Sequence, residues 1–188
     1  TLLFVYLGSY DRAIEVGQNA IRLQPLDSRS HTYLAWAYNA ARDFGRAEEA
    51  LKRAGDLDPG DILSRATLGW IYYWQPRFDD ALRMYREAET LRPGHYWIRY
   101  LLARLYLSQD KVEEAVAEYQ KVLEVSPKFA GAYYWIGWVR FQQGRYEEAL
   151  GQFSLAIQNR LPFGDAYTDA ARALEAQGER LAAFVEPH

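Results

Sequence analysis

Three pairs of adjacent carboxylates are the residues of this sequence whose types and spacing most resemble catalytic chemistry. They are Asp79 and Asp80, Glu113 and Glu114, and Glu147 and Glu148. Paired carboxylates can perform general acid–base catalysis when their surroundings shift one pKa towards neutrality. Each pair here stands at the expected start of a helix, where the helix dipole favours negative charge. We therefore interpret the pairs as helix-start residues on a solvated face.

The other chemistry-bearing residues form no catalytic or metal-binding motif. His31, His95 and His188 lack the i, i+4 spacing that builds a zinc site. The chain has no cysteine, which excludes disulfides, thiolate catalysis and cysteine-ligated metals. It has neither a glycine-rich phosphate loop nor a nucleophile elbow. We predict that the protein is not an enzyme and that it has no catalytic residues, no metal site and no cofactor.

Composition and charge limit the classes of partner. The 188 residues are 49% hydrophobic and 25% charged, with a formal net charge of −3, values that are ordinary for a folded soluble protein. These totals favour neither nucleic acid nor an anionic membrane as the main partner. The apolar stretch from Leu2 to Leu7 is too short to span a bilayer and lacks the flanks of a signal peptide. The sequence is compatible with both cytoplasm and periplasm.

A period of 34 residues organises the chain and determines which elements position its side chains. Prolines recur at this spacing, at Pro25, Pro59, Pro93 and Pro127. The same step links six alanines, Ala13, Ala47, Ala81, Ala115, Ala149 and Ala183. It also links a series of small residues, Ala35, Gly69, Ala103, Gly137 and Ala171. Each unit contains two helical apolar stretches, and proline ends the second. We predict two antiparallel helices per unit, packed closely through the small residues.

This unit resembles the tetratricopeptide repeat, whose pattern is W-x2-L-G-x2-Y, then A-x3-F, A and P. The third unit matches in Leu68, Gly69, Tyr72, Phe78, Ala81, Tyr85, Ala88 and Pro93, and the fifth in Ile136, Gly137, Gly144, Tyr146, Ala149, Phe153 and Ala156. The resemblance implies an all-α fold, an α-α superhelix that covers residues 1–188. We expect full repeats at 28–61, 62–95, 96–129 and 130–163, between partial repeats at 1–27 and 164–188. The last one is expected to stop within its second helix.

The segment GWIYYW, residues 69–74, places four aromatic rings in five positions. Consecutive residues of a helix point to different faces, so these rings cannot all enter one core. At about 100° per residue, Leu68, Gly69 and Tyr72 define the core arc, and Trp70 lies roughly 150° from its centre. Steps of 34 give one line across the first helices, formed by Trp36, Trp70, Arg104, Trp138 and Arg172. We predict that all six tryptophans, Trp135 included, lie off the core arc.

The resemblance implies that the first helices line a concave surface that binds peptide segments of partner proteins. We predict an aromatic-lined binding surface with arginines as polar anchors. Its residues are Trp36, Trp70, Tyr73, Trp74, Trp97, Tyr100, Arg104, Tyr134, Trp138, Phe141 and Arg172. The leading hypothesis is a non-enzymatic interaction scaffold that binds an apolar or aromatic-rich peptide. The alternative for these rings, above all for Trp135, is packing in the seams between neighbouring first helices.

Two other functions also fit the sequence. Flat rings can stack on sugar faces, and similar repeats occur in bacterial polysaccharide export machinery, so a carbohydrate-contacting module is one. A structural spacer of a larger protein is the other, with self-association through the truncated ends, where Leu2, Leu3, Phe4 and Val5 lack their full helix partner. The family's clamp for a C-terminal carboxylate has no counterpart here, because no lysine falls on the predicted binding arc.

Overall fold

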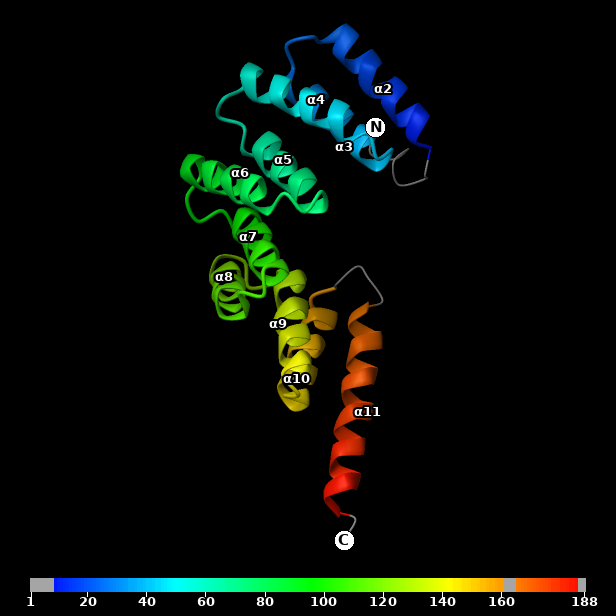
Figure 1. Cartoon of the computed structure of the whole chain (residues 1–188), viewed down its shortest axis with the longest axis vertical. Coiled ribbons are helices and arrows are strands. Elements are labelled where there is room, and N and C mark those ends of the chain that lie inside the picture. The colour runs from blue at the N-terminus through cyan, green and yellow to red at the C-terminus, as the bar shows by residue number, and fades with distance from the viewer. Residues whose placement is uncertain (1–8, 161–164, 186–188) are drawn as a thin grey trace. The chain divides into compact units, whose positions relative to one another are not determined.

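The computed structural model describes residues 9–160 and 165–185, and within these ranges every regular element is an α-helix (Figure 1). The helices are α2 (Tyr10–Leu23), α3 (Ser28–Ala40), α4 (Phe44–Leu57), α5 (Ile62–Trp74), α6 (Phe78–Leu91), α7 (Tyr96–Ser108), α8 (Val112–Val125), α9 (Ala130–Gln142), α10 (Tyr146–Gln158) and α11 (Asp165–Val185). The predicted all-α fold class is confirmed. Among the described residues, none of these helices has the length and apolar character to cross a membrane. The self-association expected through residues 2–5 concerns a segment outside the described ranges.

The chain divides into two units, Thr1–Leu101 and Leu102–His188, with the division inside α7. In the first unit, α3 packs against α4 and α5 packs against α6, while α4 also contacts α5 and α3 contacts both α2 and α5. In the second unit, α9 contacts α8 and α10, and α11 contacts α9 and α10. In each unit a helix thus contacts its neighbours along the chain, as expected when successive helix pairs stack.

Aspartates fix the start of two first helices. Asp27 Oδ2 accepts a hydrogen bond from the Ser30 amide at 3.1 Å. Asp61 accepts hydrogen bonds from the amides of Leu63 and Ser64, at 2.9 and 3.1 Å. These bonds satisfy amides that the first turn of a helix leaves without an intrahelical partner. The starts of α3 and α5 are thereby fixed, and with them the direction in which their aromatic residues point.

In three repeats, the turn that connects the two helices contains a residue with left-handed backbone conformation. The φ angle is +63° at Arg42, +58° at Asp110 and +70° at Gly144. The amide of the next residue closes the turn, as when Lys111 N donates to Tyr106 O at 2.9 Å. This closure is the Schellman motif, which prefers glycine because an L side chain in this region costs about 1 kcal/mol or more.

Replacing Asp110 with glycine is expected to raise the free energy of unfolding by about 0.5–1 kcal/mol, because glycine removes that steric cost. Asp110 is exposed, and Gly144 occupies the equivalent position 34 residues later. Urea unfolding of the Asp110→Gly variant measures the effect, and an unchanged or lower midpoint would contradict it. Arg42→Gly should gain less, because the Arg42 guanidinium lies 5.5 Å from the centre of the Phe44 ring and that contact would be lost.

Small residues form the centre of the helix packing in both units. The alanines of the repeated series are fully buried at Ala13, Ala47, Ala81, Ala115 and Ala149. A Cβ atom added to Gly69 would lie 2.5 Å from Tyr85 Cε1, and one added to Gly137 would lie 2.8 Å from Phe153 Cε1. Both rings are fully buried. The packing role predicted for these small residues is therefore confirmed.

The last helix departs from the repeat. The 34-residue register places a turn near Gly178, but α11 runs without a break from Asp165 to Val185. Helix-favouring residues on both sides outweigh the cost of about 1 kcal/mol for one glycine inside a helix. In the described part of the chain no second helix folds back onto α11, so Ala171 is exposed whereas its equivalent Gly137 is buried. Ala171 is thus an exception to the series of buried small residues.

Candidate interaction surface

The tryptophans of the first helices stay at least partly accessible in both units. Trp74 is 55% exposed and Trp97 is 39% exposed. The other four are half-buried, namely Trp36, Trp70, Trp135 and Trp138. Tyr72, which the sequence assigns to the core, is only 3% exposed. The accessibility of the tryptophans therefore agrees with the prediction that they lie off the core arc. The contacts of each ring indicate whether it lies on the surface or packs between neighbouring helices.

Three rings of α5 contact one another at the surface. Trp70 and Tyr73 are parallel, with ring centroids 5.4 Å apart and an interplanar angle of 10°. Trp74 stands edge-on to both, at 5.6 Å from each. Tyr73 and Trp74 follow Trp70 by three and four positions, the spacings that bring helix side chains together. The four rings of residues 69–74 are thus divided between the core, which receives Tyr72, and this surface cluster.

Trp36 lies in the seam between α3 and α5. Its Nε1 donates a hydrogen bond to Thr67 Oγ1 at 3.0 Å. Its ring stands edge-on to Tyr33, with centroids 5.8 Å apart. Tyr33 is 37% exposed. The hydrogen bond of Trp36 thus joins α3 to α5, and its ring contact with Tyr33 extends the exposed aromatic surface. The sequence analysis missed Tyr33, although it lies three positions from Trp36.

The start of α7 carries a further stacked pair in the first unit. The rings of Trp97 and Tyr100 lie 5.3 Å apart with an interplanar angle of 24°. Both residues are accessible, Trp97 more than Tyr100. With the rings described above they make up a set that we call the unit-1 aromatic face: Tyr33, Trp36, Trp70, Tyr73, Trp74, Trp97 and Tyr100.

In the second unit, the predicted binding residue Arg104 covers the ring of Trp135, the tryptophan named above all for packing between neighbouring first helices. The guanidinium of Arg104 lies 4.4 Å from the centre of the Trp135 ring, within the range of a cation–π interaction. Trp135 in turn contacts Trp138, with centroids 5.8 Å apart. Trp135, which does not belong to the 34-residue line, thus lies between two residues that do, Arg104 and Trp138.

The remaining predicted rings of the second unit pack closer to the core. Tyr134, Trp138 and Phe141 pack against the buried cluster of Ala149, Phe153 and Ala173. The Tyr134 hydroxyl also donates to Asp169 Oδ2 at 2.8 Å, joining α9 to α11. Arg172 pairs with the same aspartate at 3.2 Å. The contacts of these three rings therefore match the alternative of packing between helices. The rings of the unit-1 aromatic face match that alternative less closely.

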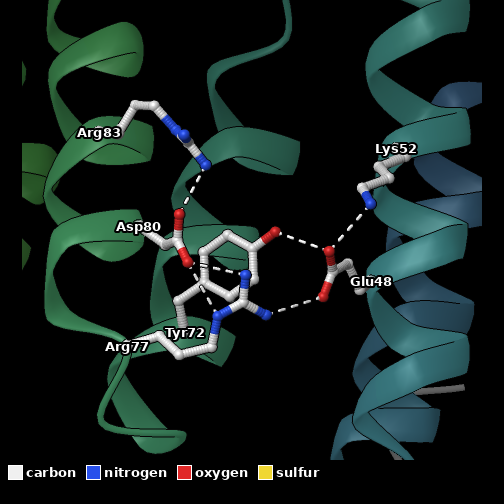
Figure 2. A network of polar contacts seen from close by, with 6 residues as sticks. All are labelled: Glu48, Lys52, Tyr72, Arg77, Asp80 and Arg83. Atoms are coloured by element: carbon white, nitrogen blue, oxygen red, sulfur yellow. Dashed lines mark hydrogen bonds and ion pairs between the residues drawn. The ribbon is translucent and has the colours of Figure 1, made fainter.

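A polar network that the sequence analysis missed joins α4, α5 and α6 (Figure 2). The Tyr72 hydroxyl donates to Glu48 Oε1 at 2.9 Å, and Lys52 reaches the same oxygen at 2.9 Å. Arg77 contacts Glu48 Oε2 at 3.2 Å, and its guanidinium lies 4.0 Å from the centre of the Tyr72 ring. Asp80 completes the network by pairing with Arg77 at 2.7 Å.

The charges of this network are held in their ordinary states. Burial, together with the hydrogen bond to Glu48, raises the pKa of Tyr72 to about 12. Burial alone would raise the pKa of Glu48, but hydrogen bonds from Lys52 and Tyr72 and the nearby Arg77 outweigh it and lower that pKa. Tyr72 is therefore neutral and Glu48 ionised near pH 7. Neither has the pKa near neutrality that a general acid or base requires, so the network fastens three helices together.

The carboxylate pairs lie in the first turns of α6, α8 and α10, as the sequence predicts. Asp79 is exposed, and Asp80 bridges Arg77 and Arg83. His31 Nε2 lies 3.2 Å from the Pro25 carbonyl oxygen. Across residues 9–160 and 165–185, no three side chains of His, Asp or Glu are grouped so that they could hold a metal ion.

Comparisons with known proteins identify the type of repeat. A family model described as tetratricopeptide repeat matches residues 2–62, 67–124 and 100–163. A search of curated protein sequences gave no match. Among solved structures, TTC0263, a thermophilic protein of Thermus thermophilus with such repeats, has a TM-score of 0.79 at 21% identity, covering 92% of this chain and 94% of its own.

Two further solved structures share the fold. MamA has a TM-score of 0.64 at 23% identity, covering 84% of this chain and 92% of its own. YrrB, described as a protein of the same repeat type with an unusual peptide-binding site, has a TM-score of 0.61 at 20% identity, covering 89% of this chain and 87% of its own. At these identities the likeness concerns the fold and does not transfer a ligand.

Proposed function

We propose that this chain, which belongs to the tetratricopeptide repeat family, binds an apolar or aromatic-rich peptide segment of a partner protein on its unit-1 aromatic face. Members of this family are typically scaffolds for protein–protein interaction and are generally non-catalytic. The finer proposal, the peptide and the face that binds it, rests on the chemistry of this chain. A peptide-binding site in YrrB, a protein of the same fold, is consistent with it.

The exposure of large aromatic rings on one set of helices carries the proposal. Trp74 and Trp97 leave 55% and 39% of their surface accessible although apolar neighbours stand beside them. Exposed aromatic surface of this kind is characteristic of interaction sites, and tryptophan and tyrosine dominate binding hot spots. The hydrogen bond of Trp36 to Thr67 and the stacking of Trp70 on Tyr73 hold rings in place before a ligand arrives, which reduces the entropy lost on binding.

The other predicted residues have a secondary part in this proposal. Arg104, Tyr134, Trp138, Phe141 and Arg172 belong to the second unit, where several of them contact core side chains or a carboxylate. We propose that these residues add to ligand binding but that the unit-1 aromatic face is the main binding surface. Binding of sugars, or a role as a spacer without any ligand, would be an outcome that contradicts the proposal.

Trp74→Ala is expected to weaken peptide binding about tenfold, or ~1.4 kcal/mol, while changing the free energy of unfolding by less than about 1 kcal/mol. The ring is more than half exposed, so its loss removes ligand contacts and little core packing. Peptide and glycan arrays probed in parallel with the whole chain would supply the ligand for this titration.

The matched control is Tyr10→Ala, which removes an exposed ring, 41% accessible, from α2. This variant should bind the array peptides as the parent does. If both variants retain full affinity, or if glycans bind and peptides do not, the peptide-binding surface is not the unit-1 aromatic face.

A further inference from the structure

The net charge of −3 conceals a division between the two sets of helices. Four first helices, α3, α5, α7 and α9, carry five arginines and no aspartate or glutamate. The second helices α4, α6, α8 and α10 carry thirteen carboxylates and six basic side chains. The helices that present the aromatic rings are therefore free of acidic side chains, and the acidic character of the chain lies on the others.

From this division we infer that the partner segment is acidic, with aspartate or glutamate residues beside its apolar anchors. The inference rests on the proposed peptide-binding function of the unit-1 aromatic face. An accessible arginine on helices that carry no carboxylate of their own attracts acidic ligands and disfavours basic ones, because like charges brought together without a counter-charge are costly.

Arg29 is the arginine on which this complementarity depends most. Its side chain is 74% exposed, against 22% for Arg65 and 23% for Arg99, and it contacts Asp27 Oδ1 through Nε at 3.4 Å. Tyr33 and Trp36 follow it by four and seven positions on α3, so the three share one face of the helix. An extended acidic segment lying across these residues would place a carboxylate at the guanidinium and an apolar side chain on the rings. Arg29 can approach a carboxylate with two parallel N–H groups.

The other two arginines on the first helices of this unit are paired with carboxylates and are much less exposed than Arg29. Arg65 pairs with Glu87 at 3.7 Å and Arg99 with Glu89 at 3.1 Å, and both arginines are mostly covered. The nearest aspartates, Asp27 and Asp61, are occupied by capping the amides of α3 and α5. Arg29 is thus the most accessible of these three arginines, and the positive charge that the surface offers to a ligand is modest.

This modest bias favours a peptide over a nucleic acid. Proteins that bind the phosphate backbone typically neutralise about 6–10 phosphates with arginine or lysine. The four first helices have only five arginines in total. Arg140 of α9, like Arg65 and Arg99, already has a carboxylate partner, Glu148 at 3.6 Å. One or two carboxylates of a peptide match the remaining charge better than a row of phosphates does.

The test uses three matched peptide libraries that share randomised apolar and aromatic positions and differ only in their polar positions, which are glutamate, glutamine or lysine. Fluorescence anisotropy with the whole chain should give the tightest binding for the glutamate library, about tenfold tighter than for glutamine, with lysine weakest. The preference for glutamate should shrink as salt is added, because exposed charges are screened.

Arg29→Gln should reduce the preference for glutamate severalfold and leave the affinity for the glutamine library unchanged. The control Arg83→Gln removes an exposed arginine of α6 and should leave every library unaffected. Equal affinity for the three libraries, or tightest binding of lysine or of a single-stranded oligonucleotide, would overturn the acidic-partner inference while leaving an apolar peptide site in place. Absence of binding by all three libraries would instead refute the proposed peptide-binding function.

Discussion

Tyr72→Ala is expected to lower the free energy of unfolding by about 3–5 kcal/mol, the range for deleting a large buried aromatic ring. Tyr72 is 3% exposed and belongs to the core arc of α5. Its loss leaves a cavity, removes the ring beneath the Arg77 guanidinium and takes one hydrogen bond from Glu48. Urea unfolding followed by far-UV circular dichroism measures the change. Tyr33→Ala, which removes a ring 37% exposed on α3, is the control and should cost less than about 1 kcal/mol.

A second variant separates the hydroxyl of Tyr72 from its ring. Tyr72→Phe keeps the ring and removes only the hydrogen bond to Glu48, which retains Lys52 and Arg77. The expected cost is about 1 kcal/mol. If Tyr72→Ala were no more costly than Tyr72→Phe, the ring would not be part of the core and the 34-residue register of α5 would be wrong.

The difference in unfolding free energy between the parent and Tyr72→Phe is expected to depend on pH. The pKa of Tyr72 is raised from 10.0 to about 12, so folding favours the protonated phenol. The stability that this provides is fully present below pH 10 and is lost as the pH rises towards 12. Tyr72→Phe has no such group, and other titrating residues are common to both proteins. The stability difference between parent and variant should therefore shrink between pH 10 and pH 12, and a constant difference would contradict the raised pKa.

The repeat explains why much of the core could be predicted from the sequence. A period of 34 residues that recurs along the chain determines which residues face inward, because several series repeat in the same register. A shift of one residue towards the N-terminus would place Arg46, Asp80 and Glu114 at the alanine positions. Ala47, Ala81 and Ala115 are all fully buried. The same argument placed Trp70 away from the core, since a helix turns by a constant angle per residue.

Contacts between helices could not be predicted in this way. The bonds of Tyr72 to Glu48 and of Tyr134 to Asp169 join residues on different helices, and their formation depends on how the helices are placed and not on spacing along one helix. The rings of Tyr73 and Trp74 lie against Trp70 on the same helix, a contact that the spacing along α5 allows but does not specify. The exposure of Ala171 follows from the continuation of α11 through Gly178, a choice between turn and helix that one glycine does not decide.

Gly69→Ala is expected to lower the free energy of unfolding by about 2–3 kcal/mol, although alanine is the better helix former by ~1 kcal/mol. The added methyl carbon would lie 2.5 Å from Tyr85 Cε1 and 2.7 Å from Cδ1, within contact distance of a ring that is fully buried. Such a ring has no room to move, so α5 and α6 must separate or strain. Thermal and urea unfolding of the variant measure the loss.

The control is the same substitution at Gly55 on α4, where no atom lies within 4 Å of the added carbon. Gly55→Ala should stabilise the protein by about 0.5–1 kcal/mol, since only the gain in helix propensity remains. If Gly55→Ala and Gly69→Ala changed stability in the same direction and by the same amount, the close approach of α5 and α6 would not exist.

Another repeat of this chain indicates a second substitution that should compensate for Gly69→Ala. At the positions equivalent to Gly69 and Tyr85, the preceding helix pair combines Ala35 with Leu51, and both are buried. Adding Tyr85→Leu to Gly69→Ala should therefore recover part of the lost stability, so that the two substitutions together cost less than the sum of their separate effects. Additive costs would mean that the methyl group and the Tyr85 ring do not meet, and that the clash is relieved elsewhere in the helix pair.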